Sequence, residues 1–499
     1  MGFWRWLAYG LGFEYEPPEP VQPRQRGFSA ADGGRLTADW LTSGFSADSE
    51  IQGSLPRLRN RARSMGRDTP YVPQIKRLMR DNIVGPAGIQ LQMRVPMLRG
   101  GGLDERANTE VENAWRLWCR PDSCDVAGRM SFLDFEWQTA MAPVESGEMM
   151  LRLVRRPFGT SNRIPLALEA IESDQLDLNY NGAVSRDGNR WRMGVELDRW
   201  GRPVNYAVLT RHPGDYLTAG QSLNMGRHEI VPAADIVHVF WPERVGQTRG
   251  VPLVAPVMAD AHQLDGYEQA ATIRARLAGS HMGFIIPADG DLQGDAVMDD
   301  QRVIDFEPGI YRRMNPGDQV ILPQLNAPDS QLEMFTRQKI RRMAAGTGVS
   351  YASLSRDASQ ANYSSQRQEY LQDQDAWSVL QSMLIQRLHQ RVFEEWLPLA
   401  VLAGAVRLPD YELRPERYLM AAQWQPRGWA WVDPKKEAEA NVISEQAGYI
   451  SKTQILTRLG TTYEQILKDK ASEHQLEQQY GVQPAAPVIA PDPAPPTDG

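Results

Sequence analysis

The chain is poor in the residue types on which disulfide-rich, zinc-binding and membrane-spanning proteins depend. Its 499 residues include only two cysteines, Cys119 and Cys124. Two cysteines are too few for a disulfide framework or a cysteine-rich zinc site, so we expect free thiols in a reducing, cytosolic setting. No apolar run approaches the ~18 residues that a membrane span needs, and the aromatic segment 1–12 lacks the apolar centre of a signal peptide. The sequence therefore predicts a soluble protein.

Motifs of common catalytic chemistry are also missing. The absence of a GxxxxGK[ST] loop argues against an ATP-driven motor of the P-loop type. There is no GxSxG nucleophile turn, and the seven histidines do not form an HExxH pattern. His238 stands between two valines on an expected strand, where a structural role is the more common one. The sequence predicts neither a cofactor nor an enzyme.

Lysine is scarce, since only seven of the 54 Lys and Arg residues are Lys. Arginine favours planar contacts with phosphate, carboxylate and aromatic groups, although a GC-rich genome would give the same bias. The net charge of -8 argues against a protein that simply coats nucleic acid.

One basic stretch covers residues 57–80, where eight Lys and Arg residues oppose a single Asp68, a local charge of +7. Proline at positions 70 and 73 predicts helices that break there. Contact with DNA, contact with an acidic neighbour and a solvated helical face all remain open as explanations.

An acidic stretch covers residues 286–310, with seven Asp and Glu residues against Arg302, a local charge of -6. Its paired aspartates, at 289 and 291 and at 299 and 300, could in principle ligate Mg²⁺ as in a nuclease. A solvated acidic loop is the more common explanation for such a stretch.

The periodicities predict an α+β protein. Residues 13–56 are rich in Pro, Gly and Ser and read as an extended arm. Apolar residues spaced by three and four predict a helix at 105–120. Strands are expected at 148–154 and 236–240, and a hairpin at 192–209.

Helices dominate the second half of the sequence. An Ala-rich helix is expected from about 253 to 283, a second from 329 to 346, and a very long one from 366 to 401, which spans ~54 Å at ~1.5 Å per residue. Two shorter helices are expected at 434–447 and 451–480, before a Pro-rich tail. Trp424, Trp429 and Trp431 could stack on bases, but packing against the long helix is the more common use of such residues.

Three segments carry a family resemblance through their residue sequences and their order along the chain. The first is RGVPL at 249–253, which opens the Ala-rich helix. The second is GVSY at 348–351 followed by NYSS at 362–365, and the third is WQPRGW at 424–429 followed by VDPKKE at 432–437. Together they resemble the portal proteins of tailed bacteriophages, in particular the lambda-type family, over most of residues 55–475.

This resemblance implies a function as well as a fold. It implies a dodecameric ring at one capsid vertex of the virion, assembled in the host cytoplasm, through which double-stranded DNA passes during genome packaging and ejection. The implied partners are the terminase large subunit, head-tail connector proteins, and the major capsid and scaffold proteins, with no membrane.

The resemblance also implies a division of the chain into regions. In chain order these are a partly disordered N-terminal arm (1–54), the first part of a mixed α/β wing (55–252), a stem helix (253–283), a small clip (284–327), a second stem helix (328–346), a tunnel loop (347–364), the long-helix part of the wing (365–429), crown-side helices (430–481) and a disordered tail (482–499).

Two sets of site residues follow from that division. Polar residues of the tunnel loop are expected to face DNA in the channel: Ser353, Ser355, Arg356, Gln360 and Asn362. Acidic residues of the clip are expected to dock partner proteins: Asp289, Asp291, Asp295, Asp299 and Asp300. No catalytic or metal-binding residues are expected. The alternatives are a Mg²⁺-dependent nuclease that uses the acidic stretch, and a ring or scaffold protein that does not handle DNA.

Overall fold

The structure is a computed structural model. It describes residues 35, 39, 42, 44–158, 163–182, 184, 185, 187–215, 227–279, 284–286, 319–321, 332–357, 359, 363–429 and 434–481. Residues 47–499 group into one unit by their contacts, and the elements below all belong to it.

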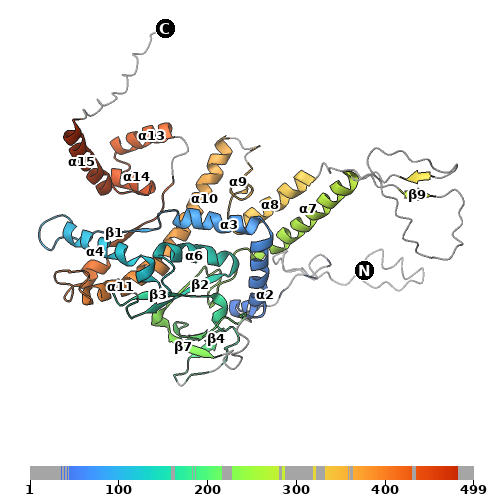
Figure 1. Cartoon of the computed structure of the whole chain (residues 1–499), viewed down its shortest axis with the longest axis horizontal. Coiled ribbons are helices and arrows are strands. Elements are labelled where there is room, and N and C mark those ends of the chain that lie inside the picture. Colours follow the sequence, from blue (N-terminus) through green and yellow to red (C-terminus); the bar gives the residue numbers. More distant parts are fainter. Residues whose placement is uncertain are drawn as a thin grey trace, which may run out of the picture. The chain divides into compact units, whose positions relative to one another are not determined.

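Helices make up most of this unit (Figure 1). In chain order the main ones are α2 (Ala47–Asp68), α3 (Tyr71–Met79), the π-helical turn η2 (Arg80–Val84), α4 (Glu105–Trp118), α5 (Pro121–Cys124), α6 (Phe132–Glu145), the 3₁₀ turn η6 (Ala255–Val257), α7 (Met258–Gly279), α8 (Leu332–Thr347), α9 (Tyr351–Ser355), α10 (Tyr363–Leu384), the π-helical turn η7 (Ile385–His389), α11 (Gln390–Leu402), α12 (Pro415–Leu419), α13 (Pro434–Gln446), α14 (Lys452–Arg458) and α15 (Tyr463–Tyr480).

The strands of the described residues form four small sheets. They are β1 (Gln90–Met93), β2 (Glu148–Val154), β3 (Ala167–Ile171), β4 (Arg190–Arg192), β5 (Val195–Leu197), β6 (Pro203–Leu209), β7 (His228–Pro232), β8 (Ile236–Phe240), β9 (Phe284–Ile286), β10 (Gln319–Ile321) and β11 (Ala422–Gln425). The sheet orders are β3-β2-β8, β4-β5-β6-β7, β1-β11 and β9-β10, and all pairings within them are antiparallel.

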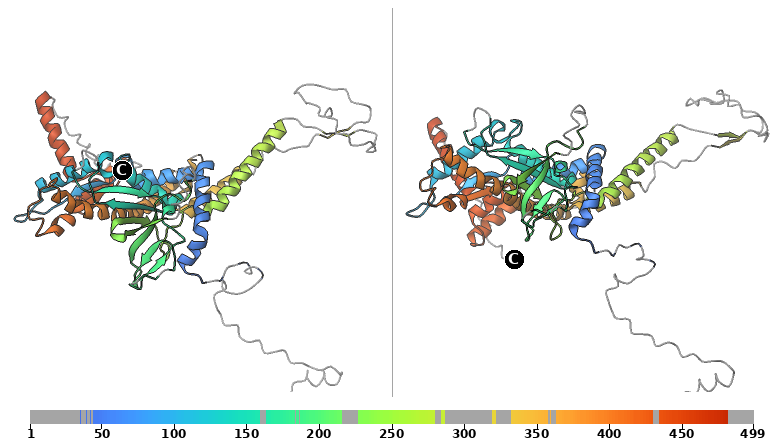
Figure 2. Two further views of the ribbon diagram at one scale, coloured as in Figure 1. Left: turned by 60° about the horizontal axis from the view of Figure 1, so that its bottom comes forward. Right: turned by 90° about the horizontal axis from the view of Figure 1, so that it is seen from below.

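Strand β2 is the centre of the three-stranded sheet, and helix α6 packs on it. The four-stranded sheet contains the hairpin expected at 192–209, with the turn 198–202 between β5 and β6. Both expected strands, at 148–154 and 236–240, are confirmed as β2 and β8. The two sheets share a small apolar core and lie side by side in both views of Figure 2.

The largest core joins segments that are far apart in the sequence. Trp115 of α4 contacts Phe393 and Trp396 of α11, with ring centroids 5.8 and 5.1 Å apart. Trp424 of β11 packs on Phe393 at 5.9 Å, and Trp429 lies 6.1 Å from Trp377 of α10. The prediction that these tryptophans pack against the long helix is therefore confirmed for positions 424 and 429, whereas 431 lies outside the described residues.

The long helix departs from its prediction in one respect. The expected single α-helix at 366–401 is α10, η7 and α11 in succession, so a π-helical turn interrupts the α-helical pattern at 385–389. His389, at the end of this turn, is fully buried and hydrogen-bonds through Nε2 to Glu136 of α6. The extra residue of a π turn is what aims His389 at that carboxylate.

Three further boundaries differ from the sequence prediction. Helix α2 begins at Ala47, inside the segment expected to be an extended arm, because Ile51 and Leu55 bury against Met193. The helix expected at 451–480 is two helices, since Gly460 adopts a φ of +78° between α14 and α15. The loop expected at 347–364 contains the short helix α9.

Helices α7 and α8, expected as the two stem helices, pack alongside each other (Figures 1 and 2). Tyr267 and Phe335 lie 4.6 Å apart by ring centroids, and Lys339 Nζ reaches Asp260 Oδ1 at 2.7 Å. Of the segment between them the structure describes only the β9-β10 pair, so all five expected clip aspartates lie outside the described residues. No helix within the described ranges is long and apolar enough to cross a membrane.

Candidate functional site

The expected tunnel loop is held in place by a single carboxylate of the long helix. Ser350 caps α9, because its hydroxyl accepts from the Ser353 backbone N–H at 3.2 Å. Asp373 of α10 accepts three hydrogen bonds from this cap: from Ser350 N at 2.9 Å, from Ser350 Oγ at 2.7 Å and from Ser353 Oγ at 2.7 Å. Asp373 is itself buried. Charge-assisted bonds of this kind are roughly twice as strong as neutral ones.

Helix α9 is fixed on its other sides as well. Gln74 of α3, also buried, donates to the Ser353 carbonyl at 3.2 Å. Tyr351 donates its hydroxyl to Asp357 at 3.2 Å, and the Arg341 guanidinium of α8 lies 5.4 Å from the Tyr351 ring centroid. Residues 350–357 are therefore a multiply bonded turn, although three of these eight residues are Ser.

Arg356 ends α9 in a left-handed conformation, with φ 55° and ψ 22°. Its backbone N–H bonds to the Ala352 carbonyl, which closes the helix, and its side chain is exposed. A non-glycine residue in this region of φ and ψ is uncommon and is held there by its surroundings. The turn thus presents the Arg356 guanidinium to solvent from a fixed base.

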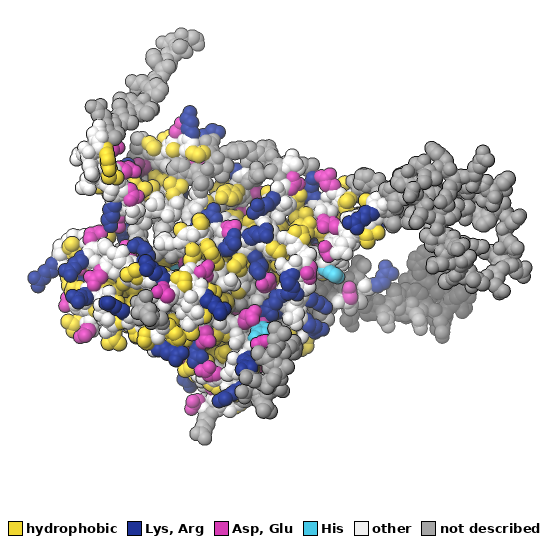
Figure 3. Space-filling model, viewed as in Figure 1, with side chains coloured by type: hydrophobic (Ala, Val, Ile, Leu, Met, Phe, Trp, Pro, Cys, Tyr) yellow, Lys and Arg dark blue, Asp and Glu magenta, His cyan; other side chains and the backbone are white. Residues whose placement is uncertain are grey.

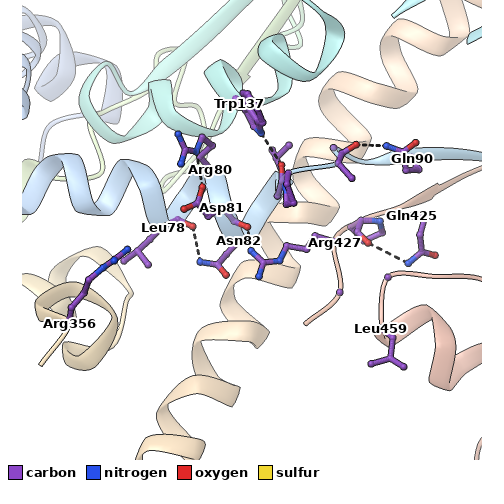
Figure 4. Close-up of a pocket in the computed structure, with 18 residues that line it drawn as sticks. Leu78, Arg80, Asp81, Asn82, Gln90, Trp137, Arg356, Gln425, Arg427 and Leu459 are labelled. Atoms are coloured by element: carbon purple, nitrogen blue, oxygen red, sulfur yellow. Dashed lines mark hydrogen bonds and ion pairs between the residues drawn. The ribbon is translucent and has the colours of Figure 1, made fainter. Parts of the chain in front are cut away.

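Arg356 faces a pocket of about 890 Å³, which we call the arginine pocket (Figure 4). Its other sides come from the end of α3, from η2 and the turn after it, from the segment after β11, and from the turn between α14 and α15. Its lining residues include Leu78, Arg80, Asp81, Asn82, Gly85, Trp137, Arg356, Gln425, Arg427 and Leu459.

Two arginines of this pocket are positioned by short-range contacts. Arg80 pairs through Nε with Asp81 at 2.7 Å and lies 5.9 Å from the Trp137 ring centroid. Arg427 donates through Nη1 to the Asp81 carbonyl. Its stem crosses Gly85, where a Cβ would come within 2.8 Å of the Arg427 Cδ atom. Glycine at position 85, with a φ of +77°, is therefore what lets the Arg427 side chain lie across the turn.

The expected channel residues differ in their contacts and in their exposure to solvent. The side chains of Ser353 and Ser355 are engaged within the protein, the first with Asp373 and the second with the Tyr351 carbonyl at 2.8 Å. Arg356 alone among the described members is exposed. Gln360 and Asn362 lie outside the described residues. Sequence reasoning missed Asp373 and Gln74, which hold the turn.

The RGVPL segment has a structural explanation in a buried ionic cluster. Arg249 is fully buried and donates to Glu148 Oε1 through Nε at 2.8 Å, and to the carbonyls of Met193 at 2.7 Å and Ser173 at 3.0 Å. The Gly250 backbone N–H donates to Glu148 Oε2 at 2.7 Å. Glu148 of β2 and the turns at Ser173 and Met193 are thereby tied to the start of the segment that leads into α7.

Two more side chains complete this cluster. Arg59 of α2 donates to Glu148 at 2.8 Å, and His238 of β8 lies 3.1 Å from it. Burial alone would raise the pKa of the Glu148 carboxyl, but Arg249, Arg59 and the hydrogen bond from His238 outweigh it and hold that pKa well below 4.5. The expectation that His238 has a structural role agrees with this position.

Gly250 is required by close packing and not by its dihedral angles. A Cβ built on Gly250 would lie 2.0 Å from the carbonyl oxygen of Gly147, which precedes Glu148 in the chain. No side chain fits between these two backbones. The Arg-Gly pair therefore supplies one side chain for the buried carboxylate and one position without a side chain beside it.

The basic stretch 57–80 is divided between the interior and the surface. Arg59 belongs to the buried cluster, while Arg63 pairs with Asp174, and Lys76 pairs with Glu145 at 2.7 Å. Part of its charge is thus neutralised by acidic neighbours within the chain. The helix break predicted near Pro70 is confirmed, because α2 ends at Asp68 and α3 begins at Tyr71. The break predicted at Pro73 is wrong, because Pro73 lies in the first turn of α3, where its missing N–H is not needed for a helical hydrogen bond.

Neither metal chemistry nor thiol chemistry is prominent in the part of the chain that the structure describes. That part contains no group of three or more His, Cys, Asp and Glu side chains placed to hold a metal ion. Both cysteines are free, and burial raises the pKa of each thiol.

The sequence and fold can be compared with known proteins. Residues 33–381 match the family model described as "Phage portal protein, lambda family". The chain is 31% identical to the probable portal protein of Halomonas phage phiHAP-1, with 93% of this chain and 90% of that protein covered. It is 25% identical to portal protein B of Escherichia phage lambda, with 91% and 90% covered. A chain from the neck of an empty GTA particle is similar at 16% identity and a TM-score of 0.42, covering 80% of this chain and 93% of that one.

These matches define a structural component of a phage particle. The chain belongs to the lambda family of phage portal proteins.

Proposed function

We propose that twelve copies of the chain form a closed ring at one capsid vertex, through which double-stranded DNA enters during packaging and leaves at ejection. Family membership supports the channel, and one observation supports the contact with DNA: Arg356 is exposed at the end of a turn that Asp373 holds rigid. In a ring, one such arginine per subunit becomes a circle of positive charge. Each contact at a solvated site contributes about 1 kcal/mol or less, so the circle guides DNA without holding it.

The partners follow from the expected regions. The acidic residues of the clip dock the terminase large subunit first and head-tail connector proteins later, and the wing contacts the major capsid and scaffold proteins after assembly in the host cytoplasm. Replacing Asp299 and Asp300 with Ser should leave rings intact and weaken binding of the terminase. Lost rings with unchanged terminase binding would show that the segment is structural.

The ring and the channel are tested together. Purified protein is expected to form rings in negative-stain images and a matching mass in light scattering, whereas monomers or dimers alone at micromolar concentration would contradict the proposal. Arg356→Ala should assemble normally and package or retain less DNA in particles. Asp375→Asn, an exposed change on α10 that leaves the turn untouched, is the control.

We propose that the protein has no catalytic activity. With Mg²⁺ or Mn²⁺ it should neither cut DNA nor hydrolyse ATP. A metal-dependent cut that Asp299→Ala or Asp300→Ala abolishes would favour the nuclease instead.

A further inference from the structure

The arginine pocket is lined by three arginines from segments that are far apart in the sequence. Arg80 comes from η2, Arg356 from the end of α9, and Arg427 from the segment after β11 (Figure 4). Among the described residues that line it, the only other ionisable one is Asp81, so these lining residues carry a formal charge of +2 in a chain whose net charge is -8. On the face that Figure 3 shows, basic and acidic side chains are interspersed, so a site with three arginines and one acid differs from that surface.

These arginines have guanidinium N–H groups that are not used in hydrogen bonds with the described residues. Arg80 uses Nε on Asp81 and Arg427 uses Nη1 on the Asp81 carbonyl, and within the described residues their remaining guanidinium N–H groups make no hydrogen bond. The Arg356 side chain likewise makes none with the described residues. A guanidinium with free N–H groups binds oxyanions, and the planar fork matches phosphate in particular.

Hydrogen bonds with buried side chains of α10 fix the segments that carry Arg356 and Arg427. Gln381 of α10, which is buried, donates to the carbonyls of Asn82 at 3.0 Å and Arg427 at 3.1 Å, and so joins the two sides of the pocket. Asp373 lies on the same helix two turns earlier and fixes the turn that carries Arg356. One helix therefore sets the position of both Arg356 and Arg427.

We propose that the arginine pocket is a phosphate-binding site, and that its ligand is a backbone phosphate of the DNA in transit, contacted by Arg80 and Arg427 together with Arg356. This inference rests on the proposed function for the source of the phosphate, while the site itself rests on the three side chains. It assigns two DNA-contacting residues that belong to the body of the protein and lie outside the tunnel loop.

The test uses the assembled full-length protein and a variant in which Arg80→Gln and Arg427→Gln are combined. Binding of a 30-base-pair duplex is measured by fluorescence anisotropy over a range of salt concentrations. Because each neutralised phosphate contributes about 0.9 to the slope of log K against log salt, we expect the slope to fall by about 0.9 for each phosphate that the variant no longer holds, and the affinity at low salt to fall about tenfold. Arg199→Gln combined with Arg202→Gln removes the same charge from an exposed hairpin turn and serves as the control.

A conservative variant separates binding from folding. Arg80→Lys combined with Arg427→Lys keeps the charge, so it should keep most of the salt slope, and all variants should form rings with melting temperatures close to wild type. An unchanged slope in the Gln variant, with intact rings, overturns the inference. Rings that fall apart in both the Gln and the Lys variants also overturn it, because the pocket would then bind an acidic segment of a neighbouring copy.

A second experiment distinguishes a phosphate of DNA from free phosphate as the ligand. Inorganic phosphate should raise the melting temperature of the wild type and not of the Gln variant. If it does so while the salt slope of DNA binding is the same in the wild type and the Gln variant, the pocket binds free phosphate and the assignment to DNA is wrong. If the wild type forms no rings, the proposed function fails, and the phosphate arm still decides whether the pocket binds anions.

Discussion

Arg249 and Arg356 are the same residue type in opposite surroundings. Arg249 is fully buried, and the carboxylate of Glu148 together with three backbone carbonyls takes its hydrogen bonds. Arg356 is exposed, and only its backbone is bonded. A buried charge must find partners inside the fold, because an unpaired one costs several kcal/mol, whereas an exposed one keeps its donors for a ligand. In this arginine-rich chain, burial separates arginines that are bonded within the fold, such as Arg249, from exposed arginines such as Arg356, for which we propose contact with DNA.

The largest effect should come from breaking the buried cluster. Arg249→Met leaves Glu148 without its main partner and three carbonyls without a donor, so the free energy of unfolding should fall by about 3–5 kcal/mol. Urea unfolding followed by circular dichroism measures this change. Arg199→Met, at an exposed position, should change stability by less than ~0.5 kcal/mol. A loss below about 1 kcal/mol for Arg249→Met would mean that Arg59 and His238 hold Glu148 on their own.

The same cluster should make stability depend on pH. Because the pKa of Glu148 is held below its usual 4.5 in the folded protein, its contribution is fully present above pH 4.5 and is lost as pH falls through the lowered value. A single proton gives a slope of at most about 1.4 kcal/mol per pH unit. Melting curves between pH 5 and pH 3 should show a shallower loss for Glu148→Gln than for the wild type. Parallel losses would place the acid sensitivity elsewhere.

A smaller, local effect should follow from releasing the turn that carries Arg356. Asp373→Asn removes the charge from three hydrogen bonds and should destabilise residues 350–357 by about 1–2 kcal/mol. Hydrogen exchange of these amides should speed up while the three-stranded sheet around β2 is unaffected. Asp375→Asn on the same helix is the matched control. Equal exchange in both variants would show that Gln74 and the α9 caps suffice.

The smallest change in stability should come from substitution of Arg356, the exposed arginine. Arg356→Gln removes no hydrogen bond made within the described residues, so the free energy of unfolding should stay within about 0.5 kcal/mol of wild type, while DNA retention falls. A marked drop in melting temperature would show that Arg356 is structural, and the contrast with Arg249 would no longer hold.

Local signals in the sequence predicted much of the fold. Two short β-like runs on either side of a turn with Asp198 and Gly201 predicted the β5-β6 hairpin. The three-four spacing of apolar residues that include Val111, Trp115 and Trp118 predicted α4. Other local signals were present but unused. Ser350 is an N-cap residue, which predicts a helix start at α9. Gly460 is typical of the end of a helix, and Thr462 is an N-cap residue that predicts the start of α15.

The long-range contacts could not be predicted. Glu148 stands at the start of an apolar strand, and nothing near it in the sequence indicates that its partners are Arg59, His238 and Arg249. The three arginines of the arginine pocket likewise come from three separate segments. The sequence analysis expected only the turn with Arg356 in the DNA channel, and it left contact with DNA open for the basic stretch that contains Arg80. Periodicity describes one element at a time, whereas a site is decided by which elements meet.

The π-helical turn at 385–389 makes the effect of a deletion in the long helix depend on where the deletion falls. A π turn holds one residue more than an α-helical turn, so deleting one residue there would let the turn close as an α-helix with α10 and α11 near their present orientations. Phe393 and Trp396 would keep their places in the aromatic core, while His389 would lose its position opposite Glu136. A deletion in the α-helical part of α10 would instead rotate α11 by about 100° around the helix axis and turn Phe393 and Trp396 out of the core. The extra residue therefore serves the buried contact of His389 and not the course of the helix.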